Sequence, residues 1–344
     1  MTTQWDVQLG IKKETVFGVG VTVDVFPEIV SEDFDWDPTF TQGAGMRVNR
    51  RVDAADRRRT AMSQVAGGFT MDVYTKIMGK FMEAALGGTG SSALVSGSAY
   101  QQLFQQSSLV NSYTIQVGIP PVAGGTTLPQ TFTGMMCTGF EISHTAGSDP
   151  SITFNWTGRA VDTVTALATA SYVSGALTFS FPQASVTLGG VVTVPTATAL
   201  ASGGTATSNV TEFNFTYENS LDEGGFNFGG GGLLSRKKVV GSAVMSGSIT
   251  AEFDTATLRD AYLTQADLPL VYTLQGSATN GVPAISGAVF PAFQIVLPNI
   301  RLEGELPKSN GGDVITQSVD FTGLDNRVAA SPIYVAIVTA ETAI

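Results

Sequence analysis

A repeat within the sequence constrains the fold more than any other feature. Residues 30–88 and 210–268 align without a gap at an offset of 180 positions. In each copy, an alternating apolar and polar run, Phe69–Val73 or Ile249–Phe253, precedes apolar residues at spacings of three and four. Alternation predicts a half-buried strand, and the wider spacing predicts a helix. The chain is therefore expected to use one strand–helix unit twice.

The similarity continues beyond these units at a shorter offset. Phe154–Gly158 resembles Val319–Gly323, and each run alternates like one strand of a hairpin. We expect two similar domains, residues 1–170 with an N-terminal arm and residues 171–344. A chain of 344 residues is long enough for two domains of ordinary size.

Composition favours a mostly β protein. Apolar residues make up 43% of the chain and charged residues only 14%, which is typical of a packed protein rather than a disordered one. Small and β-branched residues are abundant and long helical patterns are scarce, so we expect one helix flanking the strands of each domain. The scarcity of charge also leaves a neutral polar surface, which fits burial against other subunits.

The sequence offers little for catalysis, metal binding or membrane insertion. A net charge of −11 argues against a basic surface for nucleic acid. Cys137 is the only cysteine and His144 the only histidine, which excludes an intrachain disulfide and the common zinc sites. We expect His144 to be a solvated residue beside a turn and Cys137 to be a small strand residue. We predict no catalytic residue, cofactor, metal, signal peptide or membrane span.

Two long segments between predicted strands carry clustered basic residues. Met46–Gln64 holds six arginines against two aspartates, and Asp222–Val240 holds three basic residues. Neither segment alternates like a strand, so we interpret both as long loops. Such a loop is either solvated or docks on a neighbouring subunit through arginine–carboxylate pairs, and the repeated basic pair favours docking. The candidates are Arg47, Arg50, Arg51, Arg57, Arg58, Arg59, Arg236, Lys237 and Lys238.

Over nearly its whole length the chain resembles the tail tube (major tail) proteins of long-tailed bacteriophages. The segments that carry the resemblance occur in the family's order, with one strand–loop–strand–helix unit used twice. They are Phe179-x-Phe181, Val186–Gly190, the loop through Gly224 to Lys238, Ser246–Thr250, and Leu297–Pro298 with the strands that follow.

The resemblance implies two β-sandwich or half-barrel tail-tube domains, each with one flanking helix. It implies domains that form rings, rings that stack, and inner strands that line a channel for the genome. In this family the long loop between the first two strands reaches the adjacent ring, and Met46–Gln64 and Asp222–Val240 match it. The implied location is the virion tail, after synthesis in the host cytoplasm. The implied partners are other copies of the chain, the tail tip, tape-measure and terminator proteins, and double-stranded DNA passing through without specific binding.

Four acidic residues are candidates for the channel wall: Asp72, Glu212, Glu252 and Asp320. Each alternates with core residues on a predicted strand, so all four point away from the core, either into the lumen or toward a covered outer wall. A negative lumen repels DNA phosphates, which favours the first position. A doubled domain could form the six-domain ring of single-domain relatives from three chains, and we favour this trimer over a hexamer.

The competing class is a two-domain β binding module or adhesin on a virion or cell surface. Such a module needs an exposed aromatic cluster in loops, whereas Trp5, Trp36 and Trp156 fall in the arm or in predicted strands. An enzyme is the least favoured reading, because no catalytic pattern was found.

Overall fold

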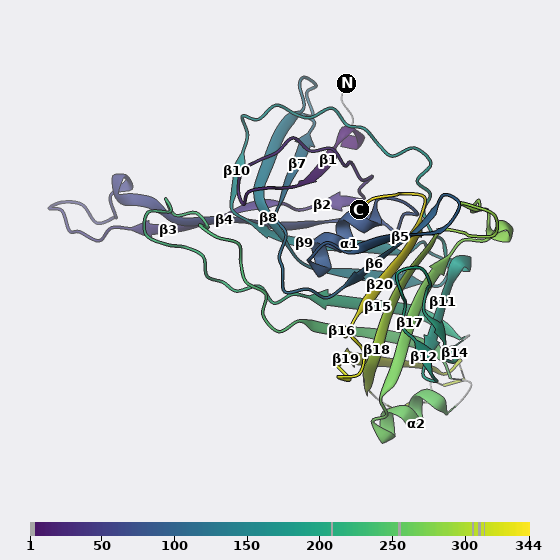
Figure 1. Ribbon diagram of the computed structural model, residues 1–344. Coiled ribbons are helices and arrows are strands. Elements are labelled where there is room, and N and C mark those ends of the chain that lie inside the picture. Colours follow the sequence, from purple (N-terminus) through teal and green to yellow (C-terminus); the bar gives the residue numbers. More distant parts are fainter. Residues whose placement is uncertain (1–3, 208, 254–255, 305, 309–310, 313) are drawn as a thin grey trace.

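The computed structural model describes residues 4–344 apart from 208, 254–255, 305, 309–310 and 313. The chain is mostly β, as predicted, and two α-helices are present in this described part (Figure 1). The helices are α1 (Met78–Leu86) and α2 (Thr257–Thr264), each following the predicted strand of its repeat unit. In the sequence, Asp254 and Thr255 are candidates for capping the second helix, and both lie outside the described residues.

The strands fall into two runs along the chain. The first run is β1 (Gln8–Lys13), β2 (Ser31–Glu32), β3 (Asp35–Gln42), β4 (Arg58–Asp72), β5 (Ser91–Ser96), β6 (Ala99–Gln105), β7 (Tyr113–Ile119), β8 (Leu128–Thr145), β9 (Ser151–Gly158) and β10 (Ala160–Asp162). The second run is β11 (Ala184–Leu188), β12 (Val192–Thr193), β13 (Ser202–Gly203), β14 (Ala206–Thr207), β15 (Val210–Glu218), β16 (Val244–Glu252), β17 (Leu268–Gln275), β18 (Ala292–Gly304), β19 (Thr316–Gly323) and β20 (Tyr334–Thr339).

A continuous antiparallel sheet, which we call the central sheet, joins strands from both runs. Its order is β3-β4-β9-β8-β15-β16-β19-β18. The first four strands come from the first run and the last four from the second. The pairing of β8 with β15, from Thr145 opposite Glu212 to Gly139 opposite Glu218, makes the two sets one sheet.

The register of the central sheet agrees with the internal repeat. Phe69 lies opposite Phe154 in the first set, and Ile249 lies opposite Val319 in the second. These are the residues that the offsets of 180 and 165 align in the sequence. The two offsets therefore describe one arrangement of strand pairs that occurs twice.

The long strands β8 and β18 each belong to two sheets. Their second halves lie in the central sheet, whereas their first halves pair in outer sheets of order β1-β7-β8-β10 and β5-β6-β20-β18-β17-β11-β14. The register of β18 shifts between Leu297 and Ile300, around Pro298, where the apolar alternation in the sequence changes phase and so predicts a bulge or bend. The core lies between these layers.

Aromatic side chains fill the core of the first set. The Phe69 ring lies 5.5 Å from that of Phe81 on α1 and 5.7 Å from that of Phe154 on β9. Phe81 also lies 5.3 Å from Phe154, so the apolar face of the helix packs directly on the sheet. Because Phe69 and Phe154 are nearly fully buried, the predicted inward parity of both strands is correct.

Three segments differ from expectation. Residues 8–13, expected within an extended arm, form β1 and pair with β7, with Leu9 and Ile11 buried. Arg58–Gln64 was predicted to be loop but forms the first half of β4. Ser91–Ser96, expected in a Gly/Ser-rich connection, forms β5 and enters the outer sheet that contains β20.

Candidate assembly surfaces

One face of the central sheet is polar across its width. A row of directly opposed residues crosses seven strands as Thr70, Thr153, Glu141, Thr216, Ser246, Thr322 and Arg301. The adjacent row is Asp72, Ser151, Ser143, Asn214, Ser248, Asp320 and Glu303. Since opposed residues point to the same side of a sheet, these rows define one surface, the polar face.

The polar face carries an excess of carboxylates and contains all four predicted channel-wall residues. Its acidic residues are Asp72, Glu141, Glu212, Glu218, Glu252, Glu303 and Asp320. Within the two rows, the one cationic side chain is Arg301. Its Nε lies 2.8 Å from Oδ1 of Asp267, so Arg301 already has an acidic partner. Glu141, Glu218 and Glu303 were not proposed from the sequence, although Glu141 and Glu218 each lie between two buried residues and Glu303 follows the buried Leu302.

Asp72 and Glu252 occupy matching positions in the two sets. Asp72 lies opposite Ser151 and Glu252 opposite Thr316, which the sequence offsets also align. Asp72 is half-buried and Glu252 is exposed. Burial, followed by the charges of Asp149 and Glu28, raises the pKa of the Asp72 carboxyl. The polar face therefore has mutually repelling carboxylates at this end of β4.

A hairpin projects from the body on the side of the molecule where β3 and β4 end (Figure 1). We call residues 37–64 the hairpin arm, because there β4 pairs with β3 and no longer with β9. Its tip exposes Met46, Val48 and Val52 almost completely. The guanidinium carbon of Arg58 lies 4.5 Å from the centre of the Phe40 ring.

The arginines of the hairpin arm are available for a partner. Arg57 donates a hydrogen bond to the Ala44 carbonyl oxygen. Within the described part of the chain, none of the six arginines of the arm forms an ion pair. Exposed arginine forks and apolar side chains on one tip form a surface that carboxylates and apolar groups could cover together.

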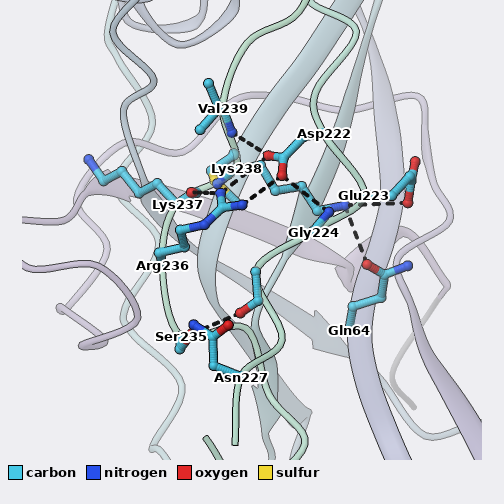
Figure 2. Close-up of polar contacts among 12 residues, drawn as sticks. Gln64, Asp222, Glu223, Gly224, Asn227, Ser235, Arg236, Lys237, Lys238 and Val239 are labelled. Carbon is cyan, nitrogen blue, oxygen red and sulfur yellow. Dashed lines mark hydrogen bonds and ion pairs between the residues drawn. The ribbon is translucent and has the colours of Figure 1, made fainter.

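The second basic loop lies against the base of the hairpin arm, and we call residues 219–243 the bracing loop. The Ser63 amide donates to the Gly232 carbonyl oxygen at 2.8 Å, which places the loop beside β4. Lys238 inserts a side chain that is only 4% exposed, with Nζ 3.4 Å from Gln64 Oε1 and 4.0 Å from Glu223 (Figure 2). The loop thus ties the arm to the body.

Asp222 organises the bracing loop from within. Its carboxylate accepts hydrogen bonds from Arg236 at 2.7 Å and from the amides of Val239 and Gly224 (Figure 2). These bonds, that from Arg236 first, hold the pKa of the Asp222 carboxyl well below its usual range. Lys237 donates to the Val110 carbonyl oxygen at 3.1 Å. All three basic residues of this loop therefore make contacts inside the chain, and Arg236 and Lys238 lie beside carboxylates, as no arginine of the arm does within the described residues.

His144 is buried, which corrects the prediction of a solvated turn residue. It lies on β8, only 5% exposed, with Nδ1 2.8 Å from the Tyr272 hydroxyl oxygen and Nε2 3.2 Å from the Ser148 carbonyl oxygen. A carbonyl only accepts, so Nε2–H donates to Ser148 and neutral Nδ1 accepts from Tyr272. Burial lowers the pKa of His144 and so favours this neutral form. The alternation that buries Phe140 and Ile142 continues to His144 and could have revealed this.

Neither a metal-binding cluster nor a membrane-spanning helix is found in the part of the chain that the structure describes. None of its acidic, histidine and cysteine side chains gather in groups of three or more suited to a metal ion. Among the same residues, no helix is long and apolar enough to cross a bilayer. Cys137 is buried on β8, as predicted, and burial raises the pKa of its thiol to about 12.

Comparison with known families decides the class of protein. The family model described as phage tail tube protein matches residues 4–323, which is nearly the whole chain. The chain belongs to the phage tail tube protein family. No individual curated protein matches it significantly.

Membership of the tail tube family fixes the general role. The family is structural rather than enzymatic, and its members are part of the phage tail within the virion. The mostly β architecture with large antiparallel sheets fits this family. The polar face and the hairpin arm are therefore candidate surfaces of an assembly.

Proposed function

We propose that this tail tube protein self-assembles into rings that stack into a tube, and that the tube conducts the genome into the host. The observation that carries the proposal is the polar face: a wide antiparallel surface of Ser, Thr, Asn and carboxylate side chains on a sheet whose opposite face is core. Such a surface suits the wall of a water-filled channel.

The charge of the polar face supports the lumen over a covered outer wall. Unpaired carboxylates are costly to bury, whereas a channel for a polyanion gains from them. Repulsion between Asp72, Glu212, Glu252, Asp320 and DNA phosphates keeps the duplex from adhering, so that it slides. DNA is thus a passing cargo that the tube does not bind specifically.

The two sets of four strands support a ring of three chains. We propose that residues 1–170 and 171–344 are duplicated domains in equivalent places, so that three chains give a pseudo-sixfold ring. About 24 strands, ~4.8 Å apart and tilted by ~40°, make a barrel roughly 45–50 Å across at the backbone. That width accommodates duplex DNA after side chains are added.

Stacking is assigned to the hairpin arm. Its six arginines and exposed apolar tip dock on the adjacent ring, and Arg236, Lys237 and Lys238 support the arm through the bracing loop. The tail tip, tape-measure and terminator proteins complete the tube. The protein is made in the host cytoplasm.

Electron microscopy and sedimentation of the purified protein across concentration and salt test the proposal. We expect rings and stacked tubes, which shorten as salt screens the arm. A protein that stays monomeric in all conditions, even with tail-tip complexes added as nuclei, contradicts it. The alternative adhesin role is not favoured, because Trp156 is buried and Trp5 and Trp36 lie on separate elements.

A further inference from the structure

The two ends of the central sheet have open edges. On one end, β3 pairs with β4 and with no other described strand. On the other end, Glu303 and Gly304 of β18 pair with β19, and the outer-sheet strand β17 reaches only to Ile300. An open antiparallel edge is a template for another strand. On these two edges the Trp36 amide donates to Asp35 Oδ1, Pro38 has no N–H, and the Leu302 carbonyl oxygen accepts from the Gln265 side chain, so the remaining backbone groups are the ones left to pair.

These two edges correspond to the two edges that already meet inside the chain. Gly139 lies opposite Asn155, and Glu303 lies opposite Asp320, which the repeat aligns with Asn155. Glu303 is therefore the counterpart of Gly139. By the same reasoning, Asp37 is the counterpart of Glu218. Asp37 lies opposite Gln64, and Glu218 lies opposite Val244, which is 180 positions after Gln64 in the sequence.

Within the chain, Gly139 and Glu218 face one another across the β8–β15 junction. We propose that the β8–β15 junction is the template for the contact between neighbouring subunits: β18 of one copy pairs antiparallel with β3 of the next, with Glu303 opposite Asp37. This inference rests on the proposed ring. Backbone pairing of the two strands closes the ring, whereas the opposed carboxylates of Glu303 and Asp37 repel each other and only mark the register. Both side chains are exposed in the single chain and lie on the polar face.

The side chains beside this pair are complementary in size. Tyr217 is fully buried against Phe140 at the internal junction, with ring centres 5.8 Å apart. Its counterpart Trp36 is 43% exposed, an unusual state for a large aromatic beside a sheet edge. The residue that corresponds to Phe140 is Gly304, which leaves room for the larger indole. The pairing thus covers Trp36 in the same way that the chain covers Tyr217.

The match between the internal junction and the proposed junction between subunits also predicts how many chains form a ring. If each junction between chains repeats the junction within a chain, every set of four strands is rotated from the next by the same angle. Rings then contain as many domains as single-domain rings do, and three chains close them. A one-residue slip would turn the polar face of one chain against the core face of the next, so parity excludes odd shifts of the register.

Disulfide trapping tests this register in assembled rings. Directly opposed residues of antiparallel strands have Cα atoms about 4.5–5.5 Å apart, within the range of a disulfide. The variant Asp37→Cys with Glu303→Cys should oxidise rapidly between chains, and a non-reducing gel should show dimer and then trimer as the largest closed species. Native Cys137 does not interfere, since its thiol is buried.

Three comparisons sharpen the result. Ser143→Cys with Asn214→Cys, opposed at the internal junction, should form an intrachain bond and report that the chemistry works. Pairing Glu303→Cys with Asp35→Cys or with Thr39→Cys should react at least ~10-fold more slowly, because diagonal positions lie further apart. Trp36→Ala should raise the concentration needed for ring formation by ~10-fold or more, as expected for a buried aromatic anchor.

The outcomes separate this inference from the proposed function. Tubes that form while the Asp37–Glu303 pair stays reduced, or that cross-link faster at Asp35 or Thr39, overturn the register and leave the tube role standing. A covalent ladder that continues to six chains overturns the trimer. If the parent protein forms neither rings nor tubes, the proposed function fails and this inference fails with it.

Discussion

At the scale of single residues, the structure separates side chains that hold the fold from those left for partners. Phe69, Phe154 and Tyr217 are buried in aromatic contacts, whereas Asp72, Glu252 and Asp320 lie on the opposite face. This division follows from strict alternation along each strand. His144 belongs to the first group, because both of its ring nitrogens have partners inside the protein.

We predict that His144 makes the protein less stable in acid. Burial depresses its pKa in the folded state, so the unfolded chain binds the proton more readily. The stability that neutral His144 contributes is fully present above the pKa of about 6.5 that the side chain has in the unfolded chain. It is lost as the pH falls toward the lower pKa that the side chain has in the folded protein. Denaturant unfolding at pH 7 and pH 5, comparing wild type with His144→Gln, measures it.

The difference between the two proteins isolates the histidine from the carboxyls. The raised pKa values of Asp72 and Glu341 act in the opposite direction, stabilising the fold as pH falls, and are common to both. Wild type should lose more stability than His144→Gln between the two pH values. Equal losses would show that His144 does not titrate differently on folding.

At the scale of elements, the two basic loops share a place in the repeat but differ in structure. The hairpin arm projects with its arginines free of ion pairs in the described chain, whereas the bracing loop places its basic residues in internal contacts. The second loop lies along the base of the first through the Ser63–Gly232 hydrogen bond. One loop is therefore suited to reach outward and the other to hold it in position.

We predict that replacing Arg57, Arg58 and Arg59 with Ala shortens tubes without changing the fold. Each exposed ion pair contributes only ~0.2–1 kcal/mol, but the ring repeats the contact, so the losses combine. Tube length at several salt concentrations, measured by microscopy, is the readout, with circular dichroism as the check on folding.

A charge-matched variant controls for net charge in this experiment. Lys12, Lys76 and Arg259 lie on the body, and replacing them with Ala removes the same charge. Tubes of this variant should keep their length and salt response. Equal shortening in both variants would assign the effect to net charge and remove the docking role of the arm.

We predict that Asp222→Ala loosens the bracing loop while the core stays folded. The change removes the acceptor for Arg236 and for the Val239 amide. Hydrogen exchange should accelerate at the amides of Val239 and Ser63. Phe228→Ala is the control, since the Phe228 side chain in the same loop is fully exposed and its removal should leave exchange unchanged. Unaltered protection in Asp222→Ala would mean that the loop is held by other contacts.

Sequence patterns identified the elements that have one buried face and missed those that do not. The alternation of Phe69–Val73 and the hairpin through Ile152 were recognisable because burial selects apolar residues at every second position. Arg58–Gln64 escaped because the projecting half of β4 buries only the polar Ser63, so no apolar alternation marks it. The open edges could not be found from sequence, since they depend on which distant strands pair.

At the scale of the whole molecule, the duplicated strand sets and the single continuous sheet point to one design. Each chain supplies two matching sets of four strands with one polar and one core face, joined at β8 and β15. The edges left open resemble the edges already joined, and the arm leaves the body at one end of the strands (Figure 1). These features fit a ring in which neighbouring chains join by strand pairing. They also fit a tube in which each ring contacts the next through the arms.

A density map of the assembled tube at side-chain resolution tests this account most directly. We predict three chains in each ring, the polar face lining the channel, and Asp72 and Glu252 at the same distance from the axis. Six chains in a ring, or Asp72 and Glu252 at different radii, would contradict the equivalence of the two halves. A polar face on the outer wall would contradict the assignment of the lumen.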